Sequence, residues 1–130
     1  MNHLLAAVLA LTAMTMDAEA HEACGIVSGA ILIAQDSEHT FLGKITNEIE
    51  SESIFNEFGK YGSEFQSNSI WNEFGSFGSE FSTYSPNNAF TSSPPMMIKN
   101  KKIIGYLSEN KVINGSISPK VLKALCADEI

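Results

Sequence analysis

The chain has 130 residues, a formal net charge of −7 and no arginine. A chain of this length has room for one domain. Its eight lysines are scattered, apart from a small group within residues 99–102. Binding to nucleic acid needs a concentrated basic surface that neutralises phosphates, and docking on an anionic membrane needs a similar one. The composition therefore excludes both classes.

The first twenty residues have the form of a cleaved secretory signal. Residues 4–14 are an almost unbroken apolar run, and a small-residue site of the Ala-x-Ala type ends at Ala20. The run is shorter than the about 20 apolar residues that span a bilayer. We expect cleavage before His21, which would leave one mature domain over residues 21–130 in the periplasm or outside the cell, with no stable membrane insertion.

Two cysteines remain after export, one near each end of the mature chain: Cys24 and Cys126. In an oxidising compartment an isolated even pair forms a disulfide most simply. The spacing lacks the Cys-x-x-Cys form that reactive or metal-binding thiol pairs favour. Closing a loop of about 100 residues stabilises a fold by about 4–5 kcal/mol in the chain-entropy model. We therefore predict a structural disulfide.

The first regular elements expected along the chain are strands. Residues 30–34 and 41–46 are apolar stretches on either side of a polar turn, so residues 30–47 are predicted to form a β-hairpin. Residues 96–109 have a similar pattern, with their turn at residues 99–101. Both second strands have the order apolar, apolar, glycine, any residue, apolar, then serine or threonine, which indicates a faint duplication.

Between these hairpins, residues 53–90 contain an internal repeat. Residues 53–68 and 69–84 are identical at ten of sixteen positions, and a third copy begins in register at residue 85. Such self-similarity indicates one small structural unit used repeatedly. Each copy begins with a serine suited to cap a helix and reaches a glycine after little more than one turn. The repeat is thus predicted to form short helical turns punctuated by glycine, anchored by its aromatic residues.

The chain is predicted to close with an amphipathic helix over residues 118–126. Ser118 is its expected cap, and Pro119 occupies the first helical position that proline favours. We therefore expect an α+β fold. The two related β-hairpins would form a small antiparallel sheet, with the repeat packed across it and the helix at the C-terminus.

The repeat also carries a resemblance. Its pattern is Ser-x-x-Asn-x-Phe-Gly-x-Tyr-Gly-Ser-x-Phe, followed by Ser-Pro-x-Asn, Pro-Pro and Gly-Tyr-Leu-Ser. This resembles uncharacterised bacterial exported proteins, in some of which a similar segment accompanies a trypsin-like peptidase domain. The resemblance covers about residues 31–125 and implies export from a bacterial cell, with no settled activity. Protease activity does not carry over, because the chain has no Gly-Asp-Ser-Gly stretch.

Catalytic chemistry is not expected. Asp36, Ser37 and His39 are the residue types of a catalytic triad, but they lie in one tight polar turn. Neighbours in one turn do not usually reach the nucleophile–base geometry that a fold assembles from distant segments. We therefore predict a solvated turn, no enzyme activity and no cofactor.

The candidate binding residues lie in the repeat. Oxygen-rich turns can hold Ca²⁺, although the usual Asp-x-Asp-x-Asp spacing is missing. The aromatic residues could form the core, or could stack on sugars or contact a protein. We predict an exported, non-catalytic structural or partner-binding protein; the alternative is a ligand-binding module for surface glycan or calcium. The candidate binding residues are Trp71, Tyr61, Glu57, Glu73, Glu64 and Glu80.

Overall fold

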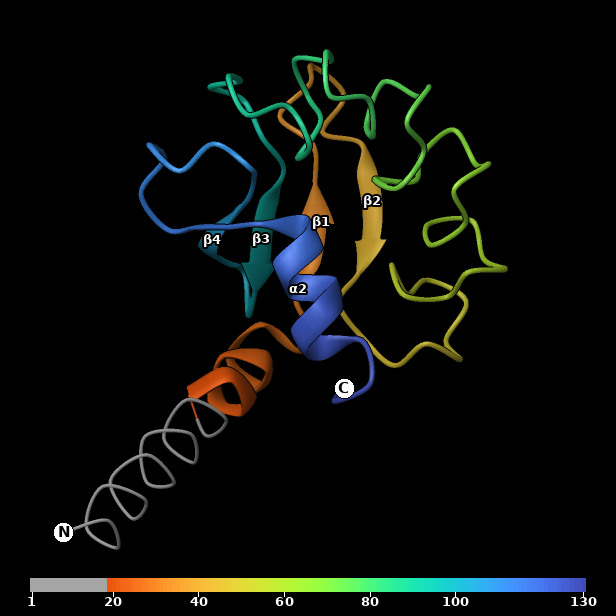
Figure 1. The fold of residues 1–130 in the computed structure, drawn as a ribbon, viewed down its shortest axis with the longest axis vertical. Helices are drawn as coiled ribbons and strands as arrows, with labels where there is room; N and C mark the ends of the chain where they lie inside the picture. The colour runs from red at the N-terminus through yellow and green to blue at the C-terminus, as the bar shows by residue number, and fades with distance from the viewer. Residues whose placement is uncertain (1–18) are drawn as a thin grey trace, which may run out of the picture.

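A computed structural model describes residues 19–130 as an α+β fold, with a five-stranded mixed sheet and two helices (Figure 1). The predicted signal peptide lies outside the described residues except for its last two. Those two belong to a helix over residues 19–27, so the predicted cleavage bond before His21 is within a helix. No helix in the described part of the chain is long and apolar enough to cross a membrane.

The strand order in the sheet is β2-β1-β3-β4-β5. β1 is antiparallel to both β2 and β3, and β3 is antiparallel to β4. The turn between β3 and β4 contains Asn100 and Lys101 at φ 53° and 65°, the left-handed conformation that tight hairpin turns use. The strands are β1 (Ile31–Ile33), β2 (Phe41–Lys44), β3 (Met96–Lys99), β4 (Lys102–Leu107) and β5 (Ser116–Ile117).

The sheet differs from the purely antiparallel one predicted, because β5 pairs in parallel with β4. The backbone N–H of Tyr106 donates to the carbonyl of Gly115 at 3.0 Å, and that of Ser108 donates to the carbonyl of Ile117 at 2.8 Å. With two residues, β5 is too short for a sequence period of two to be visible. The fifth strand therefore had no signal of its own.

The helix α2 (Pro119–Cys126) begins and ends as predicted within one residue. The Ser118 side chain accepts a hydrogen bond from the Val121 N–H at 3.3 Å. This bond satisfies one of the backbone N–H groups that have no partner within the helix at its start. Leu122 and Cys126 are its buried apolar side chains, together with Pro119 at the first turn. The core that they join also contains residues of the 19–27 helix, the sheet and the first two repeat copies: Cys24, Val27, Ala30, Leu32, Ala34, Leu42, Ile45, Ile54, Phe55, Ile70, Met97 and Leu107.

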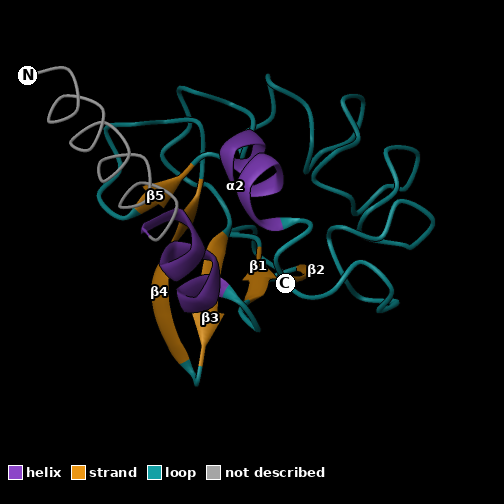
Figure 2. Cartoon of the chain, turned by 60° about the horizontal axis from the view of Figure 1, so that its bottom comes forward, coloured by secondary structure: helices purple, strands orange, loops and turns teal. Residues whose placement is uncertain are grey.

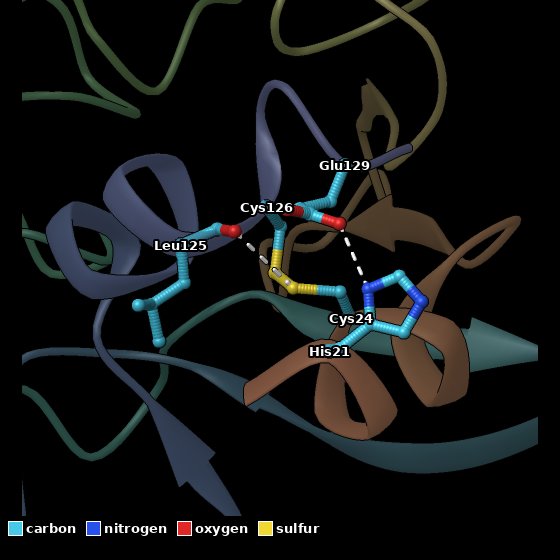
Figure 3. The surroundings of a disulfide bond; sticks show 5 residues. All are labelled: His21, Cys24, Leu125, Cys126 and Glu129. Carbon is cyan, nitrogen blue, oxygen red and sulfur yellow. Dashed lines mark hydrogen bonds and ion pairs between the residues drawn. A yellow bond between two sulfur atoms is a disulfide. The ribbon is translucent and has the colours of Figure 1, made fainter. Parts of the chain in front are cut away.

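The predicted disulfide is confirmed: Cys24 and Cys126 are bonded, with Cα atoms 5.4 Å apart (Figure 3). It joins the 19–27 helix to the end of α2 across a sequence separation of 102 residues. An exposed pair lies beside it, in which His21 Nδ1 is 2.8 Å from Glu129 Oε2. Exposed pairs of this kind contribute little to stability. The covalent bond is therefore a stronger link between the two helices than this ion pair.

The repeat contains no helix, so the helical turns predicted for residues 53–90 are wrong. Figure 2 draws the segment between β2 and β3 as loop throughout, and the backbone there is a succession of turns. These turns lie beside β2, the edge strand (Figure 1). The backbone of Lys44 in β2 is hydrogen-bonded to the first of these turns. Its N–H donates to the Glu52 carbonyl at 2.8 Å, and its carbonyl accepts from the Ile54 N–H at 3.0 Å. The repeat thus covers part of an edge that would otherwise offer free backbone groups.

Candidate functional site

Each repeat copy begins with a buried serine whose side chain closes a local backbone turn. The hydroxyl oxygens of Ser53, Ser69 and Ser85 accept hydrogen bonds from the backbone N–H two residues later, at 3.0, 3.1 and 3.0 Å. A helix cap would accept from the second or third residue and then continue into helical turns. Here the serine closes a local turn, which competes with helix formation. The residue after each serine is also buried: Ile54, Ile70 and Pro86.

An asparagine three residues after each serine forms the next turn. The side-chain oxygens of Asn56, Asn72 and Asn88 accept from the N–H two residues later, at 3.0, 3.1 and 3.0 Å. Their side-chain nitrogens donate to carbonyls six residues earlier, at 3.1, 3.0 and 3.0 Å. The asparagine side chain thus reaches back to the preceding turn, and so fixes where the following residue points.

A phenylalanine follows each of these turns and points into solvent. Phe58, Phe74 and Phe90 have 98, 97 and 94 % of their surfaces exposed. A second turn within each of the first two copies presents another one, because Ser63 and Ser79 accept from the N–H of Phe65 and Phe81, each at 3.2 Å. Those two rings are 84 and 85 % exposed. We call the five rings the phenylalanine face: Phe58, Phe65, Phe74, Phe81 and Phe90.

A further hydrogen bond, at an equivalent place in each case, joins a repeat copy to the copy before it. Trp71 Nε1 donates to the Ile54 carbonyl at 2.6 Å, and Asn87 Nδ2 donates to the Ile70 carbonyl at 2.8 Å. The Pro86 carbonyl continues the series by accepting from the Glu109 N–H at 2.8 Å. The third copy is therefore connected to the chain that follows β4. The face is held on a column of successive turns, each bonded to the next.

Glycine is required where the chain crosses beneath each phenylalanine pair. A Cβ added at Gly62 would lie 2.0 Å from the Asn56 carbonyl oxygen, and one at Gly78 would lie 2.1 Å from that of Asn72. Both contacts are to backbone, which cannot move aside cheaply. These glycines let two turns of one copy pack directly on each other.

Two equivalent grooves open on this column, one in each of the first two copies. The first has a volume of about 350 Å³ and the second about 470 Å³. Each is lined by two phenylalanines, two glutamates, the buried glycine and one lysine of α2. The glutamates are Glu57 and Glu64 in the first groove, and Glu73 and Glu80 in the second. A third groove of about 360 Å³ lies between them and shares all of its lining residues except Asn72 with them. The grooves therefore form a continuous row.

Trp71 lines all three grooves, and its ring already carries a cation. The Lys123 ammonium lies 4.5 Å from the centre of the Trp71 ring, a distance at which cation–π attraction operates. The α2 lysine of the second groove is Lys120, one helical turn earlier. The structure thus brings Trp71 together with all four predicted glutamates.

Tyr61, the sixth predicted binding residue, lies elsewhere. It packs edge-to-face against Phe41 of β2 with ring centres 5.1 Å apart, and Lys60 Nζ is 5.6 Å from its ring centre. Its contacts attach the first copy to the sheet. It does not line any of the grooves described.

The expectation that the aromatic residues anchor the repeat is correct for some of them and wrong for others. Phe55 is buried in the core, and Trp71 and Phe77 are partly buried against it. The five rings of the phenylalanine face are exposed. The sequence distinguishes the two groups: four of the five exposed rings directly follow a glutamate, at residues 57, 64, 73 and 80, whereas the inward rings do not. Nothing in the sequence indicated that the α2 lysines would line the grooves, because only the tertiary fold brings α2 to the repeat.

The polar turn between β1 and β2 does not form a triad. The Asp36 carboxylate is occupied by Thr40, accepting from its hydroxyl at 2.6 Å and from its backbone N–H at 2.9 Å. Burial acts to raise the pKa of Asp36, but the hydrogen bonds from Thr40 and the nearby His39 ring outweigh it and leave the pKa below its ordinary value of 3.8. His39 is exposed, at φ 48°. The turn is therefore held by its own side chains, as solvated turns commonly are.

Within residues 19–130, no three His, Cys, Asp or Glu side chains gather into a group that could hold a metal ion. The four groove glutamates are not close enough together to count as such a group. No protein-family model, no curated protein and no solved structure matches the chain.

Proposed function

We propose that this chain is an exported, non-catalytic protein that binds a protein partner through the phenylalanine face. One observation carries the proposal: five phenylalanines in sequence register are 84–98 % exposed, while serine, isoleucine and proline of the same repeat are buried. Apolar patches of this kind on a soluble protein mark interaction surfaces. Aromatic side chains are also the residues enriched at the centres of protein interfaces.

The local hydrogen bonds support the proposal, because they hold the backbone of each exposed ring in place. Every ring of the face is at the end of a turn closed by an asparagine or serine side chain. A partner would therefore meet ring positions whose backbone is already ordered. Preorganisation of this kind lowers the entropy cost of binding.

The disulfide supports the exported location that the proposal includes. Such bonds form and persist in oxidising compartments and are rare where thiols are kept reduced. The predicted signal peptide and the single bonded pair Cys24–Cys126 agree on the same compartment.

A glycan is the second candidate ligand, and one observation favours it: the grooves combine aromatic rings with carboxylates and Asn72 or Asn87, groups that can stack on sugars and bond to their hydroxyls. Calcium is not proposed, because the glutamates are spread along the grooves and do not converge. The glycan candidate predicts that neutral oligosaccharides quench Trp71, the only tryptophan of the chain.

The test is cross-linking of the tagged protein inside the cells that export it, followed by mass spectrometry. We expect a reproducible protein adduct with the unaltered chain and its loss in a Phe58→Ser/Phe74→Ser/Phe90→Ser variant. The matched control replaces exposed apolar residues outside the repeat, Ile26→Ser/Ile103→Ser, and should retain the adduct. An adduct that survives in the triple phenylalanine variant would overturn the proposal.

A further inference from the structure

The row of grooves has a chemistry that a purely apolar partner would not match. Each of the two equivalent grooves holds two exposed glutamates and one lysine between its phenylalanine walls. Four carboxylates against two ammonium groups leave the row with a formal charge of −2. Within residues 19–130 the only ion pair is that of His21 with Glu129, so no groove glutamate is paired there.

The repeat places a carboxylate next to a ring four times over. Glu57, Glu64, Glu73 and Glu80 each directly precede a ring of the phenylalanine face. A group that is flat, positively charged and bears hydrogen-bond donors fits both features, because it can stack on the ring and donate to the carboxylate. The guanidinium of arginine has these properties, whereas the ammonium of lysine is a compact and strongly hydrated charge.

The structure already contains one example of a cation on an aromatic ring that lines these grooves. The Lys123 ammonium lies 4.5 Å from the centre of the Trp71 ring, at the wall of the first groove. In the second groove, the residue that corresponds to Trp71 is Asn87, and Lys120 makes no cation–π pair with any ring of residues 19–130. The Trp71 ring therefore accepts a cation supplied by α2, whereas the five phenylalanine rings pair with no cation of the described chain.

On this basis we propose that the row of grooves binds a basic polypeptide segment of the partner, with successive arginine side chains entering the two equivalent grooves. This rests on the proposed function, since it names the chemistry of that same partner. The sixteen-residue repeat supplies two copies of one site, so a segment with two suitably spaced arginines binds more tightly than one with a single arginine. A second copy of this chain is a poor occupant: it has no arginine, and its own face would bring four more carboxylates.

The probe is a synthetic peptide of alternating arginine and leucine, eight residues long, titrated into the purified protein at low salt. Trp71 reports the binding without a label, because it is the only tryptophan and lines every groove of the row. We expect a saturable change in its emission that weakens as salt is added. The lysine–leucine peptide should bind about fivefold more weakly, as expected from the loss of stacking on exposed rings. The glutamate–leucine peptide should not bind.

Two double variants separate this site from general attraction to an acidic protein. Glu73→Gln/Glu80→Gln removes both carboxylates of the second groove and should weaken the arginine peptide about tenfold or more, as loss of charge-assisted hydrogen bonds requires. Glu22→Gln/Glu38→Gln changes the net charge by the same amount at exposed positions outside the repeat and should leave the affinity unchanged. Equal weakening by the two variants would overturn the inference.

The other occupants give distinct results, each of which overturns this inference. A neutral hexasaccharide that quenches Trp71 while the arginine peptide does not would assign the grooves to glycan. Concentration-dependent dimerisation in sedimentation that the phenylalanine replacements abolish would assign the face to a second copy. If the cellular adduct depends on the phenylalanine face but all three peptides fail to bind, the proposed function stands and only the basic chemistry of the partner is wrong.

Discussion

The sheet and the repeat both provide hydrogen-bond partners for their backbone N–H and C=O groups, but by different means. In the sheet, strands bond to strands, and α2 and the 19–27 helix pack apolar side chains against the same core. In the repeat, serine and asparagine side chains take the backbone N–H groups that a helix or strand would use. Order in this chain therefore does not require regular secondary structure. The repeat can leave its five face phenylalanines outside, because side-chain hydrogen bonds and the buried Ile54 and Ile70 hold it together.

The largest effect should come from the disulfide that joins the 19–27 helix to the end of α2. Replacing both cysteines, Cys24→Ser/Cys126→Ser, should lower the free energy of unfolding by about 4–5 kcal/mol, because the unfolded chain regains the freedom of a loop of about 100 residues. Urea unfolding measures it. A reducing agent should destabilise the unaltered protein and leave the double variant unaffected. An equal response of both proteins would contradict the account.

The next effect tests the buried side of the repeat. Ile70 is fully buried, so Ile70→Ala should lower the free energy of unfolding by about 2–5 kcal/mol through lost burial and the cavity left behind. Ile49 is the matched control, since it is 84 % exposed and ends a turn closed by Asn47. Ile49→Ala should change stability by about 0.5 kcal/mol or less in urea unfolding. Equal losses at both positions would mean that the burial of Ile70 does not set its contribution to stability.

The glycine under the second groove tests how the turns pack. Gly78→Ala should destabilise the protein by about 1–3 kcal/mol, since the added Cβ would lie 2.1 Å from the Asn72 carbonyl oxygen. Gly25, in the 19–27 helix, has no atom within 4 Å of an added Cβ and provides the control. Gly25→Ala should be neutral or slightly stabilising in the same unfolding measurement. A neutral Gly78→Ala would show that the column of turns is loosely packed.

The smallest effect concerns the turn between β1 and β2. Folding lowers the pKa of Asp36, so its negative charge stabilises the fold at every pH above the ordinary pKa of 3.8. This contribution is lost as the pH falls through the lower pKa of the folded protein. Asp36→Asn should therefore have a lower melting temperature than the unaltered protein at pH 7, and the difference should shrink below pH 3.8. Glu38→Gln, an exposed change in the same turn, is the control. A difference that stays constant with pH would contradict the role of the charge.

The sequence predicted those parts of the fold whose patterns have a physical period or a fixed chemistry. The paired cysteines, the capped helix at Ser118 and the α+β class follow from such signals. The length of the repeat is visible in the sequence too. Its conformation was mistaken, because a serine followed by asparagine three residues later suits both a helix cap and a pair of local turns. Nothing local decides between them.

The sequence indicated some residues of the candidate site but not their arrangement. Trp71 and the four glutamates line the grooves, whereas Tyr61 packs against Phe41 of β2. Which aromatic rings point outward could not be read from a period of two or of 3.6, because the turns follow neither. Lys120 and Lys123 come from α2, far along the chain, and only the tertiary fold places them beside the repeat.

The most direct test of the account is the stability of a chain without the phenylalanine face. The variant replaces Phe58, Phe65, Phe74, Phe81 and Phe90 with serine, and urea unfolding followed by circular dichroism gives its midpoint. The account predicts a folded protein with a midpoint close to that of the unaltered chain, because these rings are 84–98 % exposed and contribute little burial. Loss of cooperative unfolding, or a drop as large as that of Ile70→Ala, would mean that the rings serve the fold and not a partner.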